Sequence, residues 1–409
     1  MSKEKRRVPK LRFPGFTEDW EQRKLSDIST KVTTKNIDVH YTETLTNSAE
    51  QGIISQVDFF DKEISNKDNI NGYYIVENND FIYNPRISTL APVGPINRNK
   101  LNRTGIMSPL YTVFRASNVD LDFLEWYFQS SHWHRYMKLN GDSGARADRI
   151  AIKDSTFFDM PIKTPVNIKE QVLIGETLEK FNQYITLHQR KLNNLKLKKK
   201  ALLQKLFPKN GERYPELRFP GFTDAWEQRK LSDILVERNE QQVETNEYPL
   251  MSFVQGHGVI PKGERYDRSF LVLDQSKKYK RTELGDFIYS SNNLETGSIG
   301  INKTGKAVIS PVYSIFYGVS IGDSQFIGIM SLLPRFIAKM IRFRQGVVYG
   351  QWRIHEKDFL DISILIPSEA ERTKITKLIL SIEELITLHQ RKLDHLQLQK
   401  KALLQQMFI

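Results

Sequence analysis

Residues 11–28 read LRFPGFTEDWEQRKLSDI, and residues 217–234 read LRFPGFTDAWEQRKLSDI. Sixteen of the eighteen positions are identical, although the two stretches begin 206 positions apart. A second matched pair closes each half of the chain, because residues 185–207 and 386–408 share 17 of 23 positions. A repeat unit of about 200 residues is too long for the modules of a solenoid. The sequence therefore predicts a duplicated domain.

The segments between these flanks differ between the two copies. They share short landmarks, namely DFIY at Asp80 and Asp286, and SPLYTVF at Ser108 against SPVYSIF at Ser310. Strand-like runs of β-branched and aromatic residues alternate with turn residues and with helical stretches, which predicts mixed α/β interiors. Identical flanks around unlike interiors indicate one fold used twice, with two different surfaces.

The closing stretches carry a heptad pattern that is typical of a coiled-coil seam. Each stretch has a stripe of ten positions at this spacing, and eight of the ten are apolar. The pattern predicts two helices of about forty residues, each about 60 Å long. We expect the helices to pack on each other, and the alternative is that each stripe covers its own globular domain. The expected seam residues are Ile185, Leu192, Leu195, Leu202, Ile386, Leu393, Leu396 and Leu403.

Composition narrows the class of protein. Lys and Arg number 60 against 48 Asp and Glu, a formal charge of +12, which favours a polyanionic partner but does not establish one. The absence of cysteine excludes disulfides and thiolate metal sites. No apolar run is long enough to span a bilayer, and the first ten residues lack the apolar stretch of a signal peptide. We expect a cytoplasmic protein with no membrane association.

Motifs for catalysis are weak. Residues 300–307 read GINKTGKA, which nearly matches a phosphate-binding loop, but Ala307 has no hydroxyl for a magnesium ion and the following residues look like a strand. Residues 83–87 read YNPRI and depart from the catalytic loop of amino-methyltransferases, and no Gly-rich cofactor loop lies upstream. We expect no catalytic residue, no metal site and no cofactor in this chain.

Residues that could read DNA bases fall in two places in each interior. Arg suits guanine and Asn or Gln suits adenine through paired hydrogen bonds, and loops present such side chains with little bulk nearby. The alternative is that these are ordinary polar loop residues. The set after DFIY comprises Asn84, Arg86, Ser88 and Thr89 in the first copy and Ser291, Asn292 and Asn293 in the second. The set in a Gly-containing segment comprises Arg146 and Arg149, and then Tyr349, Gln351 and Arg353.

The arrangement of these motifs resembles the specificity subunit of type I restriction–modification systems, in particular its Gram-positive branch. The residues that carry the resemblance are the tandem LRFPGF openings, the DFIY and SPLY/SPVY landmarks, and the closing ITLHQRKL helices, and together they cover nearly the whole chain. Any one of these landmarks alone would be a weak signal.

The resemblance implies an α+β fold with two target-recognition domains and a pseudo-two-fold axis. Residues 1–165 and 211–367 would form the two domains, and residues 166–210 and 368–409 would form two long antiparallel spacer helices. Each domain would read one half of a split, asymmetric DNA sequence. The subunit would do no chemistry itself.

The resemblance also implies partners. The chain would bind double-stranded DNA, two modification subunits that methylate adenine with S-adenosylmethionine, and two restriction subunits that use ATP and Mg. Aromatic residues of the repeated openings could anchor those partners, or could equally close the core of each domain. The candidate anchors are Phe13, Phe16, Trp20, Phe219, Phe222 and Trp226. Two other classes of function stay open at this stage, an enzyme with its own site and a coiled-coil scaffold with no nucleic-acid role.

Overall fold

The chain divides into two compact units, Met1–Arg190 with Gln390–Ile409, and Lys191–His389. The computed structural model describes residues 7–60, 67–142, 148–254, 258–261, 277–294, 298–320, 322–347 and 351–409.

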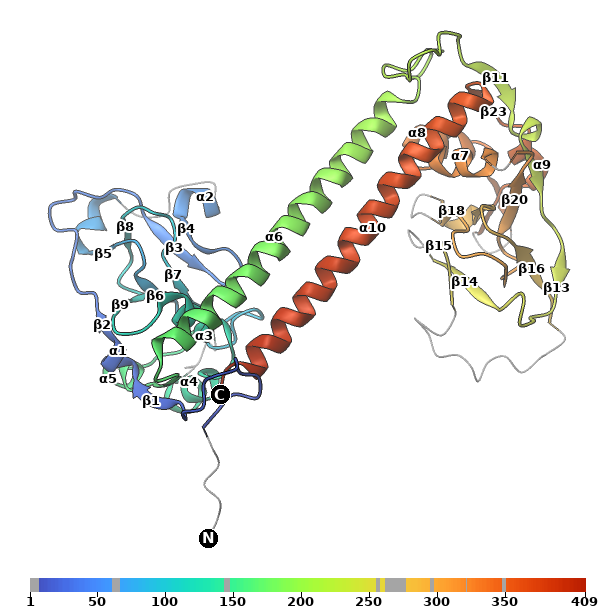
Figure 1. Ribbon diagram of the computed structural model, residues 1–409. Helices are drawn as coiled ribbons and strands as arrows, with labels where there is room; N and C mark the ends of the chain where they lie inside the picture. Colours follow the sequence, from blue (N-terminus) through green and yellow to red (C-terminus); the bar gives the residue numbers. More distant parts are fainter. Residues whose placement is uncertain are drawn as a thin grey trace. The chain divides into compact units, whose positions relative to one another are not determined.

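The first unit is a mixed α/β structure around one antiparallel sheet of four strands, in the order β2-β9-β6-β7 (Figure 1). The pairs β1–β10, β3–β4 and β5–β8 flank this sheet. Its elements are β1 (Glu21–Lys24), α1 (Leu25–Ile28), β2 (Ser29–Lys31), β3 (Leu45–Ser48), β4 (Gly52–Ser55), α2 (Gln56–Phe60), η1 (Lys67–Gly72), β5 (Tyr74–Val76), β6 (Phe81–Tyr83), β7 (Ile96–Arg98), β8 (Gly105–Met107), β9 (Thr112–Ala116), α3 (Leu121–Gln129), α4 (His134–Asn140), α5 (Asp154–Phe158) and β10 (Pro161–Thr164).

The second unit repeats this plan with the antiparallel sheet β12-β20-β17-β18. The smaller sheets are β11–β23, β13-β16-β19, β14–β15 and β21–β22. Its elements are β11 (Glu227–Lys230), η2 (Leu231–Asp233), β12 (Leu235–Glu237), β13 (Gln241–Gln242), β14 (Met251–Val254), β15 (Gly258–Pro261), β16 (Tyr279–Thr282), β17 (Phe287–Tyr289), η5 (Ser291–Asn293), β18 (Ile299–Ile301), β19 (Ala307–Ile309), β20 (Ser314–Gly318), α7 (Asp323–Met330), α8 (Pro334–Ile341), β21 (Gln345–Val347), β22 (Gln351–Arg353), α9 (Glu356–Leu360) and β23 (Ser363–Ile366).

The DFIY landmark forms the same buried strand in both units. Its last three residues are β6 in one copy and β17 in the other, and all of them are buried. Phe81 pairs with Phe114 across the first sheet, and Phe287 pairs with Phe316 across the second. The prediction of mixed α/β interiors is confirmed, and the landmarks are repeated because they form equivalent parts of two cores.

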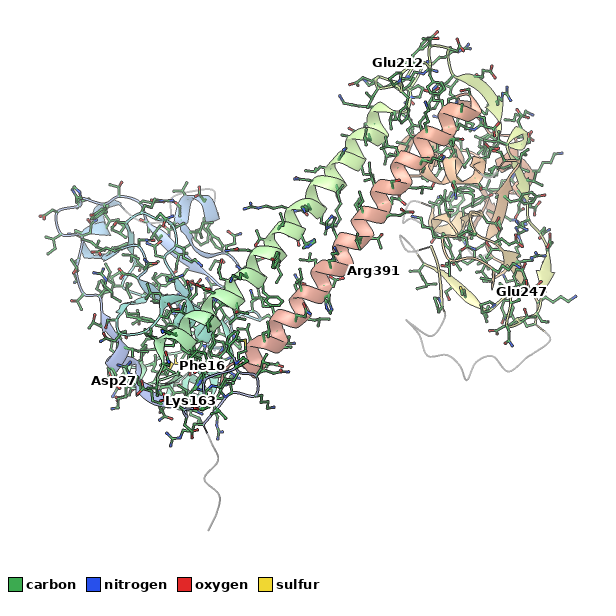
Figure 2. All side chains as sticks on the ribbon, viewed as in Figure 1. Phe16, Asp27, Lys163, Glu212, Glu247 and Arg391 are labelled. Atoms are coloured by element: carbon green, nitrogen blue, oxygen red, sulfur yellow. The ribbon has the colours of Figure 1, made fainter. Side chains whose placement is uncertain are left out.

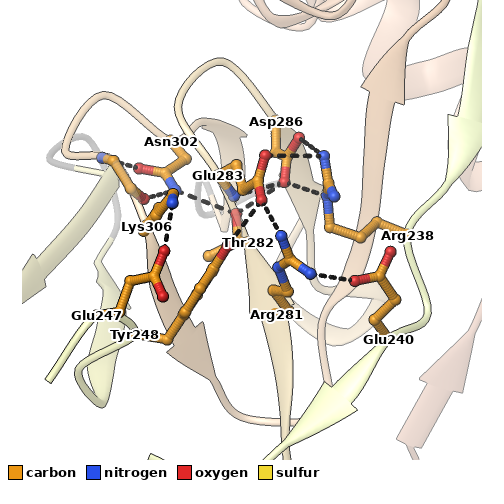
Figure 3. A network of polar contacts seen from close by, with 11 residues as sticks. Arg238, Glu240, Glu247, Tyr248, Arg281, Thr282, Glu283, Asp286, Asn302 and Lys306 are labelled. Atoms are coloured by element: carbon orange, nitrogen blue, oxygen red, sulfur yellow. Dashed lines mark hydrogen bonds and ion pairs between the residues drawn. The ribbon is translucent and has the colours of Figure 1, made fainter. Parts of the chain in front are cut away.

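The aspartate of DFIY is buried in both copies and is bound by an arginine that comes from a different strand in each. Asp80 accepts hydrogen bonds from Arg115 on β9 at 2.7 and 3.0 Å, and Asp286 accepts them from Arg238, which follows β12, at 2.8 and 3.2 Å (Figure 3). Burial raises the pKa of Asp286, and the bonds from Arg238 oppose that rise. Each aspartate also accepts a bond from the backbone N–H three residues earlier, so it fixes the turn before the strand.

Two long helices, α6 (Ile168–Lys205) and α10 (Glu369–Gln406), each contribute a segment to both units. In the first unit, Ile174 and Leu178 share a core with Met407, while Asn182 accepts a 3.0 Å hydrogen bond from Lys400. Residue numbers rise along one helix as they fall along the other, so the two segments are antiparallel.

The second unit pairs its helix segments in the same way. Leu203 and Leu206 share a core with Ile379, and Lys199 lies 2.7 Å from Glu383. Burial acts to raise the pKa of Glu383, but Lys199 and Lys303 lower it. Lys199 and Lys400 are the cations that interrupt the two apolar stripes, and each one finds a polar partner on the facing helix.

Burial along both helices follows the predicted stripe. None of the twenty stripe positions is exposed, whereas many residues between them, such as Arg391 in Figure 2, are exposed. Leu192 and Leu393 are buried, and the other expected seam residues are half-buried: Ile185, Leu195, Leu202, Ile386, Leu396 and Leu403. Helix bounds fall inside the predicted spacer ranges, and the division into two domains and two spacers stays a prediction.

The repeated opening holds the two helix segments together within each unit. Arg12 donates bonds of 2.7 and 2.8 Å to the buried Glu170 near the start of α6, and the N–H of Leu11 donates to the carbonyl of Gln406 at the end of α10. The second unit repeats both contacts, because Arg218 binds Glu371 at 2.8 Å and Leu217 donates to the carbonyl of Lys205. In each unit the opening therefore joins the start of one long helix to the end of the other, and we call these contacts the clamp.

This clamp gives a prediction about stability. Replacing Arg12 by Ala leaves Glu170 as a buried, uncompensated carboxylate, and we expect the free energy of unfolding of the first unit to fall by about 3–5 kcal/mol. Urea unfolding followed by tryptophan fluorescence measures the change, since Trp20 lies beside this pair. The double variant R12M/E170M removes both charges and serves as the control that recovers most of the loss. A loss below about 1 kcal/mol for R12A would contradict the role of the clamp.

Candidate nucleic-acid interface

The structure brings the two candidate loops of the first unit together. The N–H of Ile87 donates to the carbonyl of Asp148 at 2.8 Å, and the N–H of Ile150 donates to the carbonyl of Pro85 at 2.9 Å. These bonds place Arg86 directly opposite Arg149 in an antiparallel bridge. Residues 63 positions apart in the sequence therefore form one surface.

The two arginines are exposed, and no ion pair joins either of them to another described residue. Like charges directly across a strand pair repel, so this placement costs stability unless an anion lies between or above them. Two other exposed arginines of the unit, Arg103 and Arg115, have carboxylate partners, Glu43 and Asp80, each at 2.7 Å. Paired guanidinium groups on a bridged loop suit a phosphate oxygen or the acceptor edge of guanine.

Asn84 holds the loop in place instead of pointing outward. Its amide nitrogen donates to the carbonyl of Asn47 at 2.8 Å, and its side-chain oxygen accepts the N–H of Arg86 at 3.0 Å. Asn47 is buried and in turn accepts a 2.7 Å bond from Asn97. Both polar atoms of Asn84 thus make a hydrogen bond inside the unit, and its role as a base reader stays a prediction.

The other candidates of the first loop remain on the surface. Ser88 and Thr89 are exposed, and the hydroxyl of Ser88 accepts the N–H of Ala91 at 3.1 Å, which leaves its proton free to donate. Arg146 lies outside the described residues. The surface of the first unit is therefore built from Arg86, Ser88, Thr89 and Arg149.

The second unit also joins its two candidate segments, but through side chains. The hydroxyl of Ser291 accepts the N–H of Ile354 at 3.0 Å, and the side-chain oxygen of Asn292 accepts the N–H of Trp352 at 2.6 Å. These two residues therefore hold η5 against the β21–β22 hairpin, a contact that uses the acceptor atom of each. Arg353 lies 3.6 Å from Glu356 and stays exposed.

Three candidates of the second unit cannot be placed in this surface. Tyr349 lies outside the described residues, and so do the side chains of Asn293 and Gln351. The sequence missed Trp352, which is exposed on β22 next to these positions. Aromatic residues are usually read as core, and only the burial of the folded chain separates an exposed one from the others.

Arg281 and Lys306, two cations elsewhere in the second unit, are already paired. Arg281 donates to Glu240 at 2.7 Å and lies 4.6 Å from the centroid of the Tyr248 ring, while Lys306 pairs with Glu247 (Figure 3). The bond to Glu247 raises the pKa of Lys306. This network stabilises the sheet β13-β16-β19, so its cations are poor candidates for phosphate contacts.

The candidate partner anchors divide into buried and half-buried residues. Trp20 is 2% exposed and Trp226 is 1% exposed, and each packs in the core of its unit. The other four are half-buried: Phe13, Phe16, Phe219 and Phe222. Burial of both indoles favours the interpretation that the tryptophans close the core of each unit, and the partner-binding role of the openings stays a prediction.

The described part of the chain offers neither a metal site nor a membrane-spanning helix. It contains no group of three or more His, Asp or Glu residues that could hold a metal ion. None of its helices is both long and apolar enough to cross a bilayer.

The near match to a phosphate-binding loop, residues 300–307, includes a turn. In this turn the side-chain oxygen of Asn302 accepts the N–H groups of Thr304 and Gly305, and strand β19 follows it where a phosphate-binding loop would have a helix.

Comparison with known proteins gives a family match for one part of the chain and a fold for nearly all of it. Residues 17–197 match the family model described as type I restriction modification DNA specificity domain. The chain is similar to the solved S subunit of a type I restriction-modification system from M. genitalium, at 12% identity and a TM-score of 0.60, over 98% of this chain and 99% of that one. It is also similar to the HsdS subunit from Thermoanaerobacter tengcongensis, at 15% identity and a TM-score of 0.45, over 97% and 98%. No curated protein matches significantly. The first structure shares its fold with nearly the whole chain.

Proposed function

Because residues 17–197 belong to the family of type I restriction modification DNA specificity domains, we propose that the whole chain is the DNA-recognition subunit of a type I restriction–modification complex. The second copy enters this proposal through the repeated flanks, which share 16 of 18 and 17 of 23 positions with the first. The subunit recognises DNA and leaves the chemistry to its partners.

One observation carries the proposal further. In each unit the same two loops meet on one surface, yet the side chains on that surface differ: Arg86 and Arg149 in the first unit, Trp352 and Arg353 in the second. Two units that share one fold but differ in surface, here called the two heads, suit the two halves of an asymmetric target. The excess of cations supports binding to the phosphate backbone as well.

The long helices set the distance between the two heads in this account. Each has 38 residues, so it is about 57 Å long at 1.5 Å per residue. Antiparallel pairing of their segments within each unit supports a continuous coiled coil with a pseudo-two-fold axis, which matches the two-fold symmetry of duplex DNA. The coiled coil acts as a ruler between the half-sites.

Partner subunits would dock on the outer faces of these helices. Both helices expose large apolar side chains at positions that correspond in the repeat, 201 residues apart. Two equivalent surfaces suit two copies of one modification subunit, which brings S-adenosylmethionine. Two restriction subunits with ATP and Mg complete the complex. The corresponding pairs are Tyr184 and Leu385, Leu187 and Leu388, and Leu197 and Leu398.

The arginine pair provides the test of DNA reading. Replacing Arg86 or Arg149 by Ala removes a group that can form paired hydrogen bonds with a guanine, each worth about 1–3 kcal/mol of discrimination. We expect modified adenines, mapped in cells that carry the chain and its modification subunit, to spread to sites that vary in one half of the target only. Cells without the chain should lose the modification.

Arg103→Ala is the matched control, because Arg103 is an exposed arginine of the same unit that binds Glu43 away from the two loops. It should leave the modified sequence unchanged. A pattern that is unaltered by R86A and by R149A would remove the two arginines from the interface. Modification that does not depend on the chain would remove the proposed function.

A further inference from the structure

A cavity of about 480 Å³ opens beside the arginine pair of the first unit. Arg86 and Arg149 both line it, together with residues of β3, of α2 and of the SPLY landmark. The hydroxyl of Tyr111 lies 3.3 Å from that of Thr46 in its wall. The cavity is thus part of the surface that we assign to DNA.

Apolar side chains make up much of the rim of this cavity. Phe59 and Phe60 are each 39% exposed, Leu90 is 69% exposed and Leu110 is 63% exposed, and all four line the cavity. Clustered apolar side chains on a protein surface mark a binding site more often than scattered ones do. Here they lie next to two cations that have no described ion-pair partner, so the occupant has both an anionic and an apolar part.

Duplex DNA has an apolar group that fits this description. In the major groove, the base edges present hydrogen-bond donors and acceptors, and the 5-methyl group of thymine is the apolar feature among them. Phosphates or the acceptor edge of guanine beside it would meet the arginines. The chemistry of the rim therefore matches a thymine next to a contacted phosphate or guanine.

The repeat gives a separate argument for Leu110. Its counterpart in the second unit is Val312, in the landmark SPVY, and Val312 is 69% exposed. The tyrosine that follows each of them is partly covered, so the landmark has both a packing residue and a surface residue. An apolar residue that is exposed in both copies does not serve the core. Its repetition indicates a role in binding.

We infer that the cavity bounded by Phe59, Phe60, Leu90 and Leu110 receives the 5-methyl group of a thymine in the half-site read by the first unit. The inference rests on the proposed function and assigns one base contact within it. Arg86 and Arg149 hold the backbone or the neighbouring guanine, and the apolar rim excludes water around the methyl group. Uracil, which lacks only that methyl, keeps every hydrogen bond of thymine and loses this contact.

Binding of the assembled complex of this chain and its modification subunit to synthetic duplexes tests the inference. Each thymine of the mapped target is replaced by uracil, one position at a time. We expect one position, in the half-site of the first unit, to lose about threefold to fivefold in affinity, the effect of one buried methyl group. The L110A variant should bind thymine and uracil duplexes equally at that position.

Leu139→Ala is the matched control, since Leu139 is an exposed leucine of the same unit, 73% exposed, that does not line the cavity. It should keep the full preference for thymine. Equal binding of every uracil duplex by the unmodified chain would overturn the inference while the target sequence is still recognised. A uracil effect that persists in L110A would overturn it as well. Loss of sequence preference in all duplexes would instead reject the proposed function.

Discussion

Exchanging residues 30–160 for the interior of another chain of the same fold should change one half of the modified DNA sequence completely and leave the other half intact. The exchanged segment contains the sheet strands β6, β7 and β9 and both candidate loops of the first unit. It leaves β1, β10, Arg12 and Glu170 in place, so the clamp on the helices is retained. We expect the largest effect of any single change here, because every base contact of one head is replaced at once.

Mapping of modified adenines measures the result of this exchange. The reciprocal change in the second unit, made between β11 and β23, is the control and should alter the other half only. If either exchange altered both halves together, the two units would not read DNA independently. In that case, the duplication of the fold could not be explained by one unit reading each half-site.

The duplication and the heptad stripe could be predicted from sequence because each repeats many residues at a fixed spacing. A helix buries its apolar stripe wherever it packs, so the burial of Leu192 and Leu393 follows from periodicity alone. The sequence could not give the partner of each stripe polar residue, because Lys400 meets Asn182 across 218 positions.

The details of the candidate interface depend on contacts that spacing does not reveal. Asn84 and Arg86 look equally suited to bases in sequence, and only the folded chain turns Asn84 inward to Asn47 and leaves Arg86 outside. Trp20 is buried for a similar reason, because Glu170 and Phe408, which follows α10, pack against it. Motif reasoning identified these as important residues but could not separate a clamp from a docking site.

The most direct test of the account lengthens the coiled coil by one heptad. Seven residues that continue the stripe are inserted after Arg190 in α6 and after Arg391 in α10, which are equivalent positions of the repeat. The helices gain about 10.5 Å, close to three base pairs at 3.4 Å each. Each added base pair also turns the duplex by roughly 35°, and the heads must follow that turn. Insertion in α6 alone makes the paired helices unequal in length, so the contacts at both ends cannot form together, and modification should be abolished.

Mapping of modified adenines in cells that carry the doubly lengthened chain measures the spacer between the two half sequences. The account predicts the same two half sequences, separated by a spacer that is about two or three base pairs longer. Modification at the original spacing would contradict the proposal that the helix pair measures the distance between the two halves of the target.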